Sequence, residues 1–431
     1  MAEAENIIQK KEKSFSAKIA WTVWFIISTF YGYQYVARVI PTVIMPDLME
    51  KFHLDAGNAG NYNGVYYIGY VLIHIPLGII LDHFSSKKVI PICILLTSLG
   101  LLPLVFTESW TLSLIGRLLI GIGSAGAAIG GFKLIRLYFG EERFTRVLGY
   151  MVTFGLIIAT YGGGSLATSV KLIGWEDTTV MIVGIGVILS ILSYLLFPNN
   201  VSEESEGFSI KVIFDDLKYI FTRKTMWMIS IMGGLLIGVL EGFADAWGVQ
   251  FLKQVYQLAE ETAASINALV TFGMAAGLII LGYLSEKLKS YYGLIIVCAI
   301  LMLVIFICLL GGYTSNITLL YILFFILGIC CAYQLLVIGK AALSASEEHA
   351  SLTAAVVNMI MMSFGYLFHV SIGKIMKMTW DGTLTANGRH LYKAINYQYS
   401  LSVVILGLVL GLIGFVLISF LETIKNSKLK K

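Results

Sequence analysis

The 431-residue chain is too apolar to be soluble: 58% of its residues are hydrophobic, only 13% are charged, and its mean hydropathy is +0.83. A soluble domain carries about 25% charged residues. The net charge of +4 is spread over short segments, which excludes the basic patch of a nucleic-acid-binding protein. Five cysteines lie in apolar segments without metal-ligand spacing, and no phosphate-binding loop or nucleophile–base motif occurs. We therefore expect that the protein is not an enzyme and that it binds neither a metal nor a cofactor.

Apolar runs long enough to cross a bilayer recur along the whole chain. A spanning helix needs about 20 mostly apolar residues. The runs cover 19–44, 61–81, 88–106, 110–132, 147–168, 178–197, 226–248, 262–284, 292–312, 317–339, 350–373 and 400–420. The sequence thus predicts an all-α membrane protein with twelve transmembrane helices.

The longest polar interruption divides these runs six and six. The predicted parts are an N-terminal tail (1–18), a first half (19–197), a linker (198–225), a second half (226–420) and a basic tail (421–431). Apolar residues on one face of the linker, from Ile210 to Phe221, predict an amphipathic interfacial helix. Most Lys and Arg residues fall in cytoplasmic segments if both termini are inside, so we expect a multi-pass protein of the bacterial inner membrane with cytoplasmic termini.

The two halves resemble each other when the sequence is shifted by 204 residues. The shift aligns Asn63 with Asn267, Gly69 with Gly273, Gly78 with Gly282, and Asp82 with Glu286. A parallel repeat of six-helix halves is a recurrent transporter architecture, with the binding site between the halves near mid-membrane. We therefore expect two pseudo-symmetric halves.

A glycine, an acid and lysines close the second run. Gly78, Asp82, Lys87 and Lys88 have counterparts at Gly282 and Glu286 in the repeat. A small residue lets helices approach closely, and the acid and lysines can hold an inner gate. The pattern resembles the signature loop of the major facilitator superfamily, although His83 and Ser85 depart from it.

A second stretch, Arg117 with Gly121 and Gly123 on the fourth run, resembles another motif of that superfamily. The resemblance implies a part for Arg117 in proton coupling or gating; hydrogen bonds to nearby backbone are the alternative. On the fifth run, Ala159 and Thr160 replace the Gly-Pro of drug antiporters, which counts against a drug exporter.

Polar and aromatic residues form stripes on the first two runs. Tyr31, Gln34, Tyr35 and Arg38 share one face of the first run. The second run adds Asn63, Tyr66, Tyr67, Tyr70 and His74 on a similar stripe. Such stripes predict a water-filled cavity, although single tyrosines could instead pack in the core or at the interface. The predicted substrate-binding residues on these two runs are Tyr31, Gln34, Tyr35, Arg38, Tyr66 and Tyr70.

The seventh run carries acids within the membrane. Glu241 and Asp245 are four residues apart, on one face, and the repeat aligns Arg38 with Gly242. The charges could form a structural ion pair. Alternatively, Arg38 binds a substrate carboxylate while Glu241 or Asp245 accepts an ammonium group or a proton. Further predicted wall residues are Trp247, Gln334 and Asn358.

Two closer resemblances concern the same segments. Residues 30–41 and 241–247 resemble a bacterial branch of the superfamily that includes phagosomal transporters of Legionella and Francisella and siderophore importers. The resemblance implies proton-driven nutrient uptake. Residues 34–38 are also similar to the Asn-Tyr-x-Asp-Arg motif of organic anion:proton symporters. Ala37 stands in place of that acid, so any proton carrier must lie elsewhere, and the seventh run is the natural candidate.

These observations predict a secondary active transporter that works by alternating access. We expect proton-coupled uptake of a small carboxylate-bearing nutrient such as an amino acid. An organic anion, a carboxylate siderophore or a nucleoside are alternative solutes, and a non-transporting nutrient sensor is the alternative class. The expected partners are the solute, protons and the lipid bilayer, and we expect a monomer.

Overall fold

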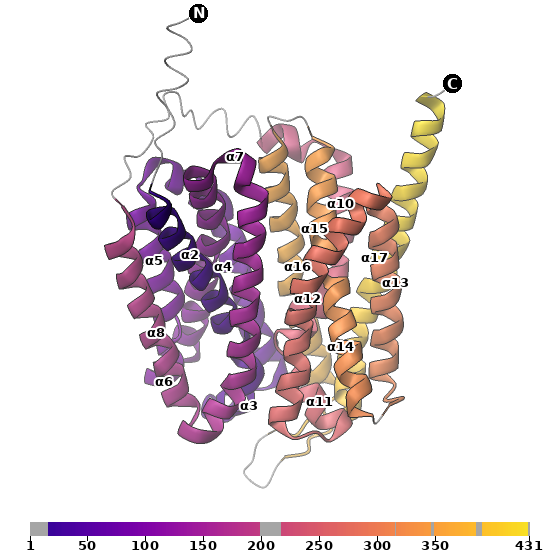
Figure 1. Ribbon diagram of the computed structural model, residues 1–431. Helices are drawn as coiled ribbons and strands as arrows, with labels where there is room; N and C mark the ends of the chain where they lie inside the picture. Colours follow the sequence, from indigo (N-terminus) through magenta and orange to yellow (C-terminus); the bar gives the residue numbers. More distant parts are fainter. Residues whose placement is uncertain (1–15, 199–216, 315, 346–348, 385–389, 430–431) are drawn as a thin grey trace, which may run out of the picture.

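The computed structural model describes residues 16–198, 217–314, 316–345, 349–384 and 390–429, and these form an all-α bundle (Figure 1). The first half comprises α2 (Ala17–Val39), α3 (Pro41–Lys51), α4 (Ala56–His83), α5 (Ser86–Leu99), α6 (Leu102–Phe106), α7 (Trp110–Ile173) and α8 (Trp175–Leu196). The second comprises α10 (Lys224–Leu236), η1 (Ile237–Val239), η2 (Leu240–Ala244), α11 (Gly248–Tyr256), α12 (Glu260–Leu288), α13 (Tyr291–Leu310), α14 (Ile317–Cys331), α15 (Tyr333–Leu343), α16 (Ala350–Met378) and α17 (Ala394–Leu429).

Several predicted spans correspond to more or less than one helix. The fourth and fifth spans both belong to α7, which bends at Gly140, where φ is +72°. Most of the predicted linker helix lies outside the described residues, and only 217–221 are seen to be helical. We call the end of the bundle where α2 begins and α17 ends the proximal end, and the opposite end the distal end (Figure 1).

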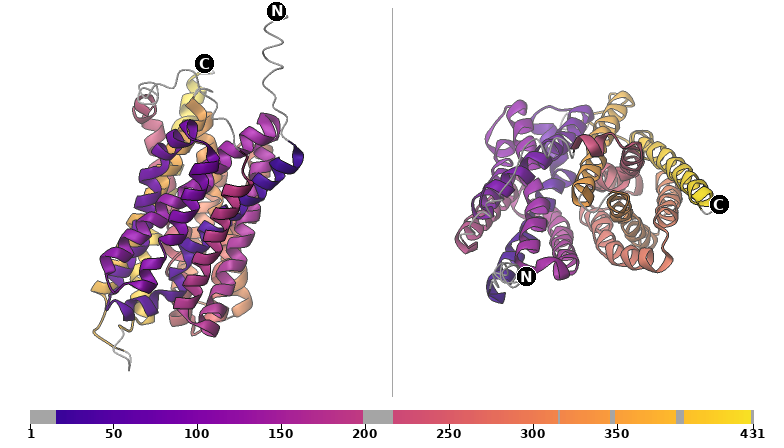
Figure 2. Two further views of the ribbon diagram at one scale, coloured as in Figure 1. Left: turned by 90° about the vertical axis from the view of Figure 1, so that its left-hand side faces the viewer. Right: turned by 90° about the horizontal axis from the view of Figure 1, so that it is seen from above.

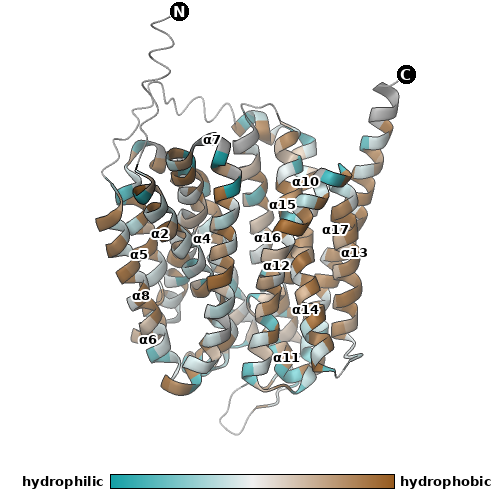
Figure 3. Cartoon of the chain, in the orientation of Figure 1, coloured by the Kyte–Doolittle hydropathy of each residue, from teal (hydrophilic) through white to brown (hydrophobic). Residues whose placement is uncertain are grey.

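The hydropathy of the helices confirms a membrane protein. Among the described residues, eleven helices are long and apolar enough to cross a membrane. The twelfth span is α2, which has 23 residues but carries the polar stripe that ends in Arg38. Brown, apolar ribbon covers much of the bundle, and teal is more frequent near its ends (Figure 3). The prediction of twelve spans is confirmed once this weakly apolar helix is counted.

The two halves stand side by side, as the views along and across the bundle show (Figure 2). They meet mainly where α4 packs against α16 and α7 against α12. Equivalent residues make equivalent contacts inside each half: a side chain on Gly69 would strike the backbone of Leu118, and one on Gly273 the backbone of Phe325. The predicted pseudo-symmetric pair of halves is confirmed by this correspondence.

The first and seventh spans are both broken, at equivalent points. The helix α2 ends at Val39 because Pro41 lacks the N–H that would continue it. The seventh span passes from α10 through the 3-10 turn η1 and the π-helical turn η2 before α11 begins. A shift of 204 residues puts Ile40 onto Ala244, so the breaks match. Interrupted helices at corresponding positions of two repeats are the best pointer to a transporter's binding site.

The halves are closed together at the distal end. A side chain on Gly60 of α4 would collide with the backbone of His369 and Gly373 on α16. Two ion pairs also cross between the halves there, Lys377 to Asp55 at 2.8 Å and Lys171 to Glu261 at 2.6 Å.

The proximal end differs. Side chains added at the motif glycines, Gly78 and Gly282, would meet no atom within 4 Å. The close helix approach that we expected of these glycines is therefore not made in this conformation. The halves thus pack tightly at the distal end, whereas open space lies beside Gly78 and Gly282 at the proximal end. The bundle is therefore closed at its distal end.

Candidate functional site

The buried charges of the first and seventh spans meet between the halves. Arg38 Nη1 lies 2.9 Å from Glu241 Oε2, and Arg38 Nε lies 2.9 Å from Asp245 Oδ2. A longer contact of 3.4 Å joins Arg38 Nη2 to Asp245 Oδ1. All three side chains are at least 94% buried. The sequence repeat predicted that Arg38 and the two acids lie at the same depth, and in the structure these side chains are in contact.

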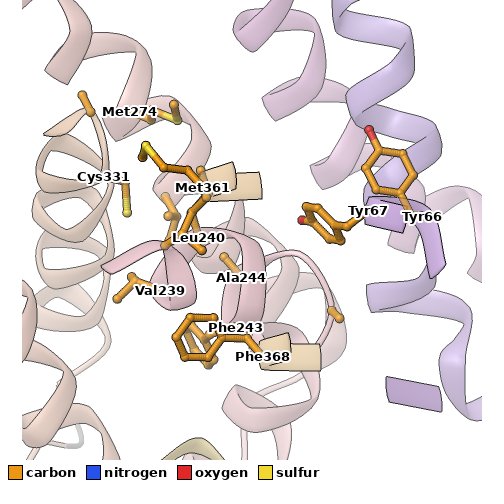
Figure 4. Close-up of a cluster of buried hydrophobic side chains, with 14 of the residues drawn as sticks. Tyr66, Tyr67, Val239, Leu240, Phe243, Ala244, Met274, Cys331, Met361 and Phe368 are labelled. Carbon is orange, nitrogen blue, oxygen red and sulfur yellow. The ribbon is translucent and has the colours of Figure 1, made fainter. Parts of the chain in front are cut away.

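The hydroxyl of Tyr67 bridges the two acids from the other half. Its oxygen lies 2.5 Å from Glu241 Oε2 and 2.9 Å from Asp245 Oδ2. Figure 4 shows Tyr67 on α4 facing the η2 segment across the boundary between the halves. Sequence reasoning put Tyr67 on a polar stripe but gave it no role. We call Arg38, Tyr67, Glu241 and Asp245 the charge cluster.

Aromatic side chains surround this cluster on the first-half side. The guanidinium of Arg38 lies 4.2 Å from the ring centre of Tyr35, which packs against Tyr31 with centroids 5.5 Å apart. Tyr66 donates to Gln34 Oε1 at 3.1 Å and stacks on Tyr70. The predicted aromatic residues of spans 1 and 2 are therefore assembled beside Arg38. A cation above an aromatic ring is stabilised by the ring's quadrupole.

Arg117 acts on the backbone of the helix break. In an α-helix the carbonyl of Ala37 would accept from the N–H of residue 41, and proline has none. Arg117 Nη1 donates to that carbonyl at 3.2 Å, and Nη2 donates to the carbonyl of Arg38 at 2.8 Å. This geometry fits the backbone-bonding alternative for Arg117.

A similar bond supports the other break. Asn267 of α12 donates from Nδ2 to the carbonyl of Ala244 at 2.9 Å, where η2 ends. A side chain on Gly248 would strike the Asn267 amide, so only glycine lets the chain after the break approach Asn267 this closely. Asn267 is the repeat counterpart of Asn63. Side chains from neighbouring spans thus satisfy backbone groups that both breaks expose.

The three predicted wall residues, Trp247, Gln334 and Asn358, make no hydrogen bond or ion pair with the charge cluster in the described part of the chain. Trp247 and Gln334 are buried, and Trp247 Nε1 and Gln334 Nε2 have no hydrogen-bond partner among the described residues. Asn358 is half-buried. His369 packs its ring 5.5 Å from that of Tyr67.

The predicted gating motif lies at the proximal end, away from the cluster. Lys87 Nζ is 5.6 Å from the ring centre of Tyr194, and Lys88 is exposed. The side chains of Asp82 and Glu286 lie outside the described residues. A latch between the acids and the lysines therefore stays a prediction.

Solved structures with this arrangement of helices are transporters. One is a bacterial homologue of the human lysosomal transporter Spinster in an inward-facing, unoccupied conformation, with a TM-score of 0.75, 18% identity, and coverage of 94% of this chain and 97% of that one. Another is the nucleoside transporter NupG, with a TM-score of 0.75, 14% identity, and coverage of 91% of this chain and 99% of that one. At these identities the likeness concerns the fold. Fold and buried charge cluster together define a polytopic membrane protein whose two halves meet at a shared polar site.

The family model of the Major Facilitator Superfamily matches residues 25–369, and the chain belongs to that family. A probable L-galactonate transporter of Escherichia coli is 23% identical over 59% of this chain and 59% of its own length. A benzoate transport protein of Acinetobacter baylyi is 29% identical over 47% of this chain and 44% of its own. The matched region thus spans about three fifths of the first of these relatives and less than half of the second.

Proposed function

We propose that the chain is a secondary active transporter that takes up a small carboxylate-bearing solute together with protons. The observation that supports this most is the charge cluster, which joins the two halves at their broken helices. Alternating access requires a site that both halves share. The proximal end, where α2 begins and α17 ends, is the cytoplasmic one in this proposal, and the membrane is the bacterial inner membrane.

Arg38 is the proposed carboxylate anchor. Its guanidinium already pairs with Glu241 and Asp245. A solute carboxylate must therefore compete with these acids for Arg38. Protonation of an acid weakens its hold on the guanidinium and so favours the solute. Competition for one guanidinium gives a physical reason for coupling solute binding to proton binding.

We expect Arg38→Ala to lower solute uptake into proteoliposomes at least tenfold while the protein still reaches the membrane. Arg38→Lys keeps the charge but loses the bidentate geometry, so we expect only partial recovery. Arg146→Ala, an exposed arginine, is the matched control. Normal saturable uptake by Arg38→Ala would contradict the assignment. No flux by the wild-type protein with any solute would instead favour the nutrient sensor.

Two solute classes fit the anchor. An amino acid suits opposed charges, since its ammonium group can face Glu241 or Asp245. An organic anion is the second candidate, favoured by relatives named for L-galactonate and benzoate. Uptake of a labelled amino acid in competition with unlabelled aldonates and aromatic carboxylates distinguishes them: the transported class competes at low concentration, and the other does not.

A further inference from the structure

We propose that Glu241 and Asp245 share one proton at the Tyr67 hydroxyl, so that the coupling site is this pair of acids and not either acid alone. The inference rests on the proposed transport function for its role in the cycle. The number of protons is inferred from geometry alone, namely from the distances among three oxygens: Tyr67 Oη, Glu241 Oε2 and Asp245 Oδ2.

A hydroxyl has a single proton to donate. Tyr67 Oη nevertheless lies 2.5 Å from one carboxyl oxygen and 2.9 Å from the other. If both acids were ionised, one of these contacts would set two oxygens against each other without a hydrogen between them. One further proton resolves this: Tyr67 donates to one acid and accepts from the other.

The charges give the same result. Arg38 contacts both acids and carries one positive charge, whereas two ionised acids carry two negative charges. One shared proton makes the contact group neutral, which matters because unbalanced buried charge is costly. Arg117 does not alter this direct balance, since its Nη atoms donate to the Ala37 and Arg38 carbonyls.

Other titratable or charged groups also face the cluster. They are Tyr31 and Tyr35 on α2, Tyr66 and Tyr70 on α4, Arg117 on α7, Cys331 on α14, Tyr333 on α15 and His369 on α16. Of these, the only permanent charge among the described residues is Arg117. The tyrosines and the cysteine are neutral near pH 7, and His369 contacts the ring of Tyr67, not the acids.

The bridge has a consequence for the two halves. Tyr67 belongs to α4 in the first half, and both acids belong to the seventh span in the second. The shared proton therefore holds the halves together at mid-bundle in the distally closed conformation. Its loss leaves two carboxylates facing one hydroxyl, which repel each other and weaken this link. Proton release and separation of the halves are thereby coupled.

Infrared spectroscopy of the purified full-length protein tests the proton count without any solute. We expect wild-type protein at neutral pH to show one carbonyl band of a protonated carboxyl group that is absent from both Glu241→Gln and Asp245→Asn. Tyr67→Phe should move the pH at which this band disappears by about one unit or more. Tyr33→Phe is the matched control, because its hydroxyl donates to the carbonyl of Ile182 inside the first half, and it should leave the band unchanged.

Absence of the band at neutral pH would overturn the shared proton, as would two independent bands that each disappear in one variant. Either result leaves the proposed transport function standing, because uptake is measured separately in proteoliposomes. Conversely, a shared band in a protein that moves no solute would support the proton pair and contradict transport. For uptake, Tyr67→Phe should displace the pH profile by about one unit or more, and an unchanged profile would contradict the coupling role.

Discussion

At the scale of single residues, Arg117 and Pro41 are linked through the carbonyl of Ala37. Proline removes the donor that this carbonyl would have in a continuous helix, and Arg117 replaces it at 3.2 Å. A buried carbonyl left without a donor costs about 1–3 kcal/mol. The two backbone bonds of Arg117 support a part in positioning the chain that carries Arg38. The coupling or gating role that the superfamily motif implied for Arg117 stays a prediction.

A double-mutant cycle tests this link. We expect Arg117→Met to lower the free energy of unfolding, and we expect the loss to be about 1 kcal/mol smaller when Pro41→Ala restores a backbone N–H. Equilibrium unfolding in mixed micelles measures both. The Arg38 carbonyl loses its donor in either background, so rescue should be partial. Strictly additive effects of the two substitutions would contradict the link.

The contacts of Arg38 were only partly predictable. The 204-residue shift brought Arg38 and Glu241 to the same depth, which the structure bears out with a 2.9 Å contact. The bridging role of Tyr67 was not predictable, because it is one of five polar residues along the same stripe of α4. Helical period tells which residues share a face, but the choice among them depends on how α4 is rotated against the second half.

At the scale of helices, the glycines of α4 divide into two groups. Gly60 lies against Gly373 and His369 at the distal end, whereas Gly78 has free space around it at the proximal end. In a rocking-bundle cycle the two ends close alternately. In this conformation α4 therefore packs closely against its neighbour at Gly60 and leaves open space beside Gly78.

We expect Gly60→Val to destabilise the distally closed conformation, because the side chain would collide with backbone. Gly78→Val should be accommodated here and should instead hinder closure of the proximal end. Distances between spin labels at the ends of α4 and α16 would report the two conformations. The substitutions are controls for each other, since they should shift the population in opposite directions. Equal shifts in the same direction would contradict the assignment.

The interruptions of the spans were missed by the search for apolar runs. The runs 19–44 and 226–248 each predicted one helix, yet both are broken. In the seventh span, the Phe368 side chain packs so closely on Gly238 and Gly242 that a side chain on either glycine would collide with it. Hydropathy is insensitive to such local changes of winding, because the residues stay apolar while their hydrogen-bond pattern changes.

At the scale of the whole molecule, an ion pair closes the distal end. Burial alone would raise the pKa of Asp55, but its bond to Lys377 at 2.8 Å and to the backbone N–H of Asn58 outweighs this and lowers the pKa below that of an ordinary aspartate. A depressed pKa means that the pair's contribution is fully present above the ordinary carboxyl pKa and is lost as pH falls through the lowered value. Because the Asp55 carboxyl stays ionised well above its pKa, closure by this pair should not change with pH from roughly 6 to roughly 8.

Asp55→Asn tests the pair while keeping the helix cap, because asparagine also caps α4 well. We expect more labelling of a distal cysteine probe in this variant at neutral pH, and a smaller change on acidification than in wild type. Asp381→Asn is the control: Asp381 pairs with Lys393 within the second half, so its loss should not open the distal end. Unchanged labelling of Asp55→Asn would show that the pair does not hold the halves together.

The weak hydropathy of α2 has a consequence for how the protein is made. This helix leaves the ribosome before the other described spans, yet among the described spans it is the one that length and composition do not mark as membrane-crossing. Arg38 lies in the last turn of α2. A buried arginine opposes membrane insertion of an isolated helix, by up to about 2.5–3.5 kcal/mol at the helix centre and by less toward its ends. The groups that neutralise Arg38 lie on the seventh span, more than 200 residues later. Biogenesis must therefore keep α2 beside the insertion machinery, or hold it with α4 and α7, until the second half has been synthesised.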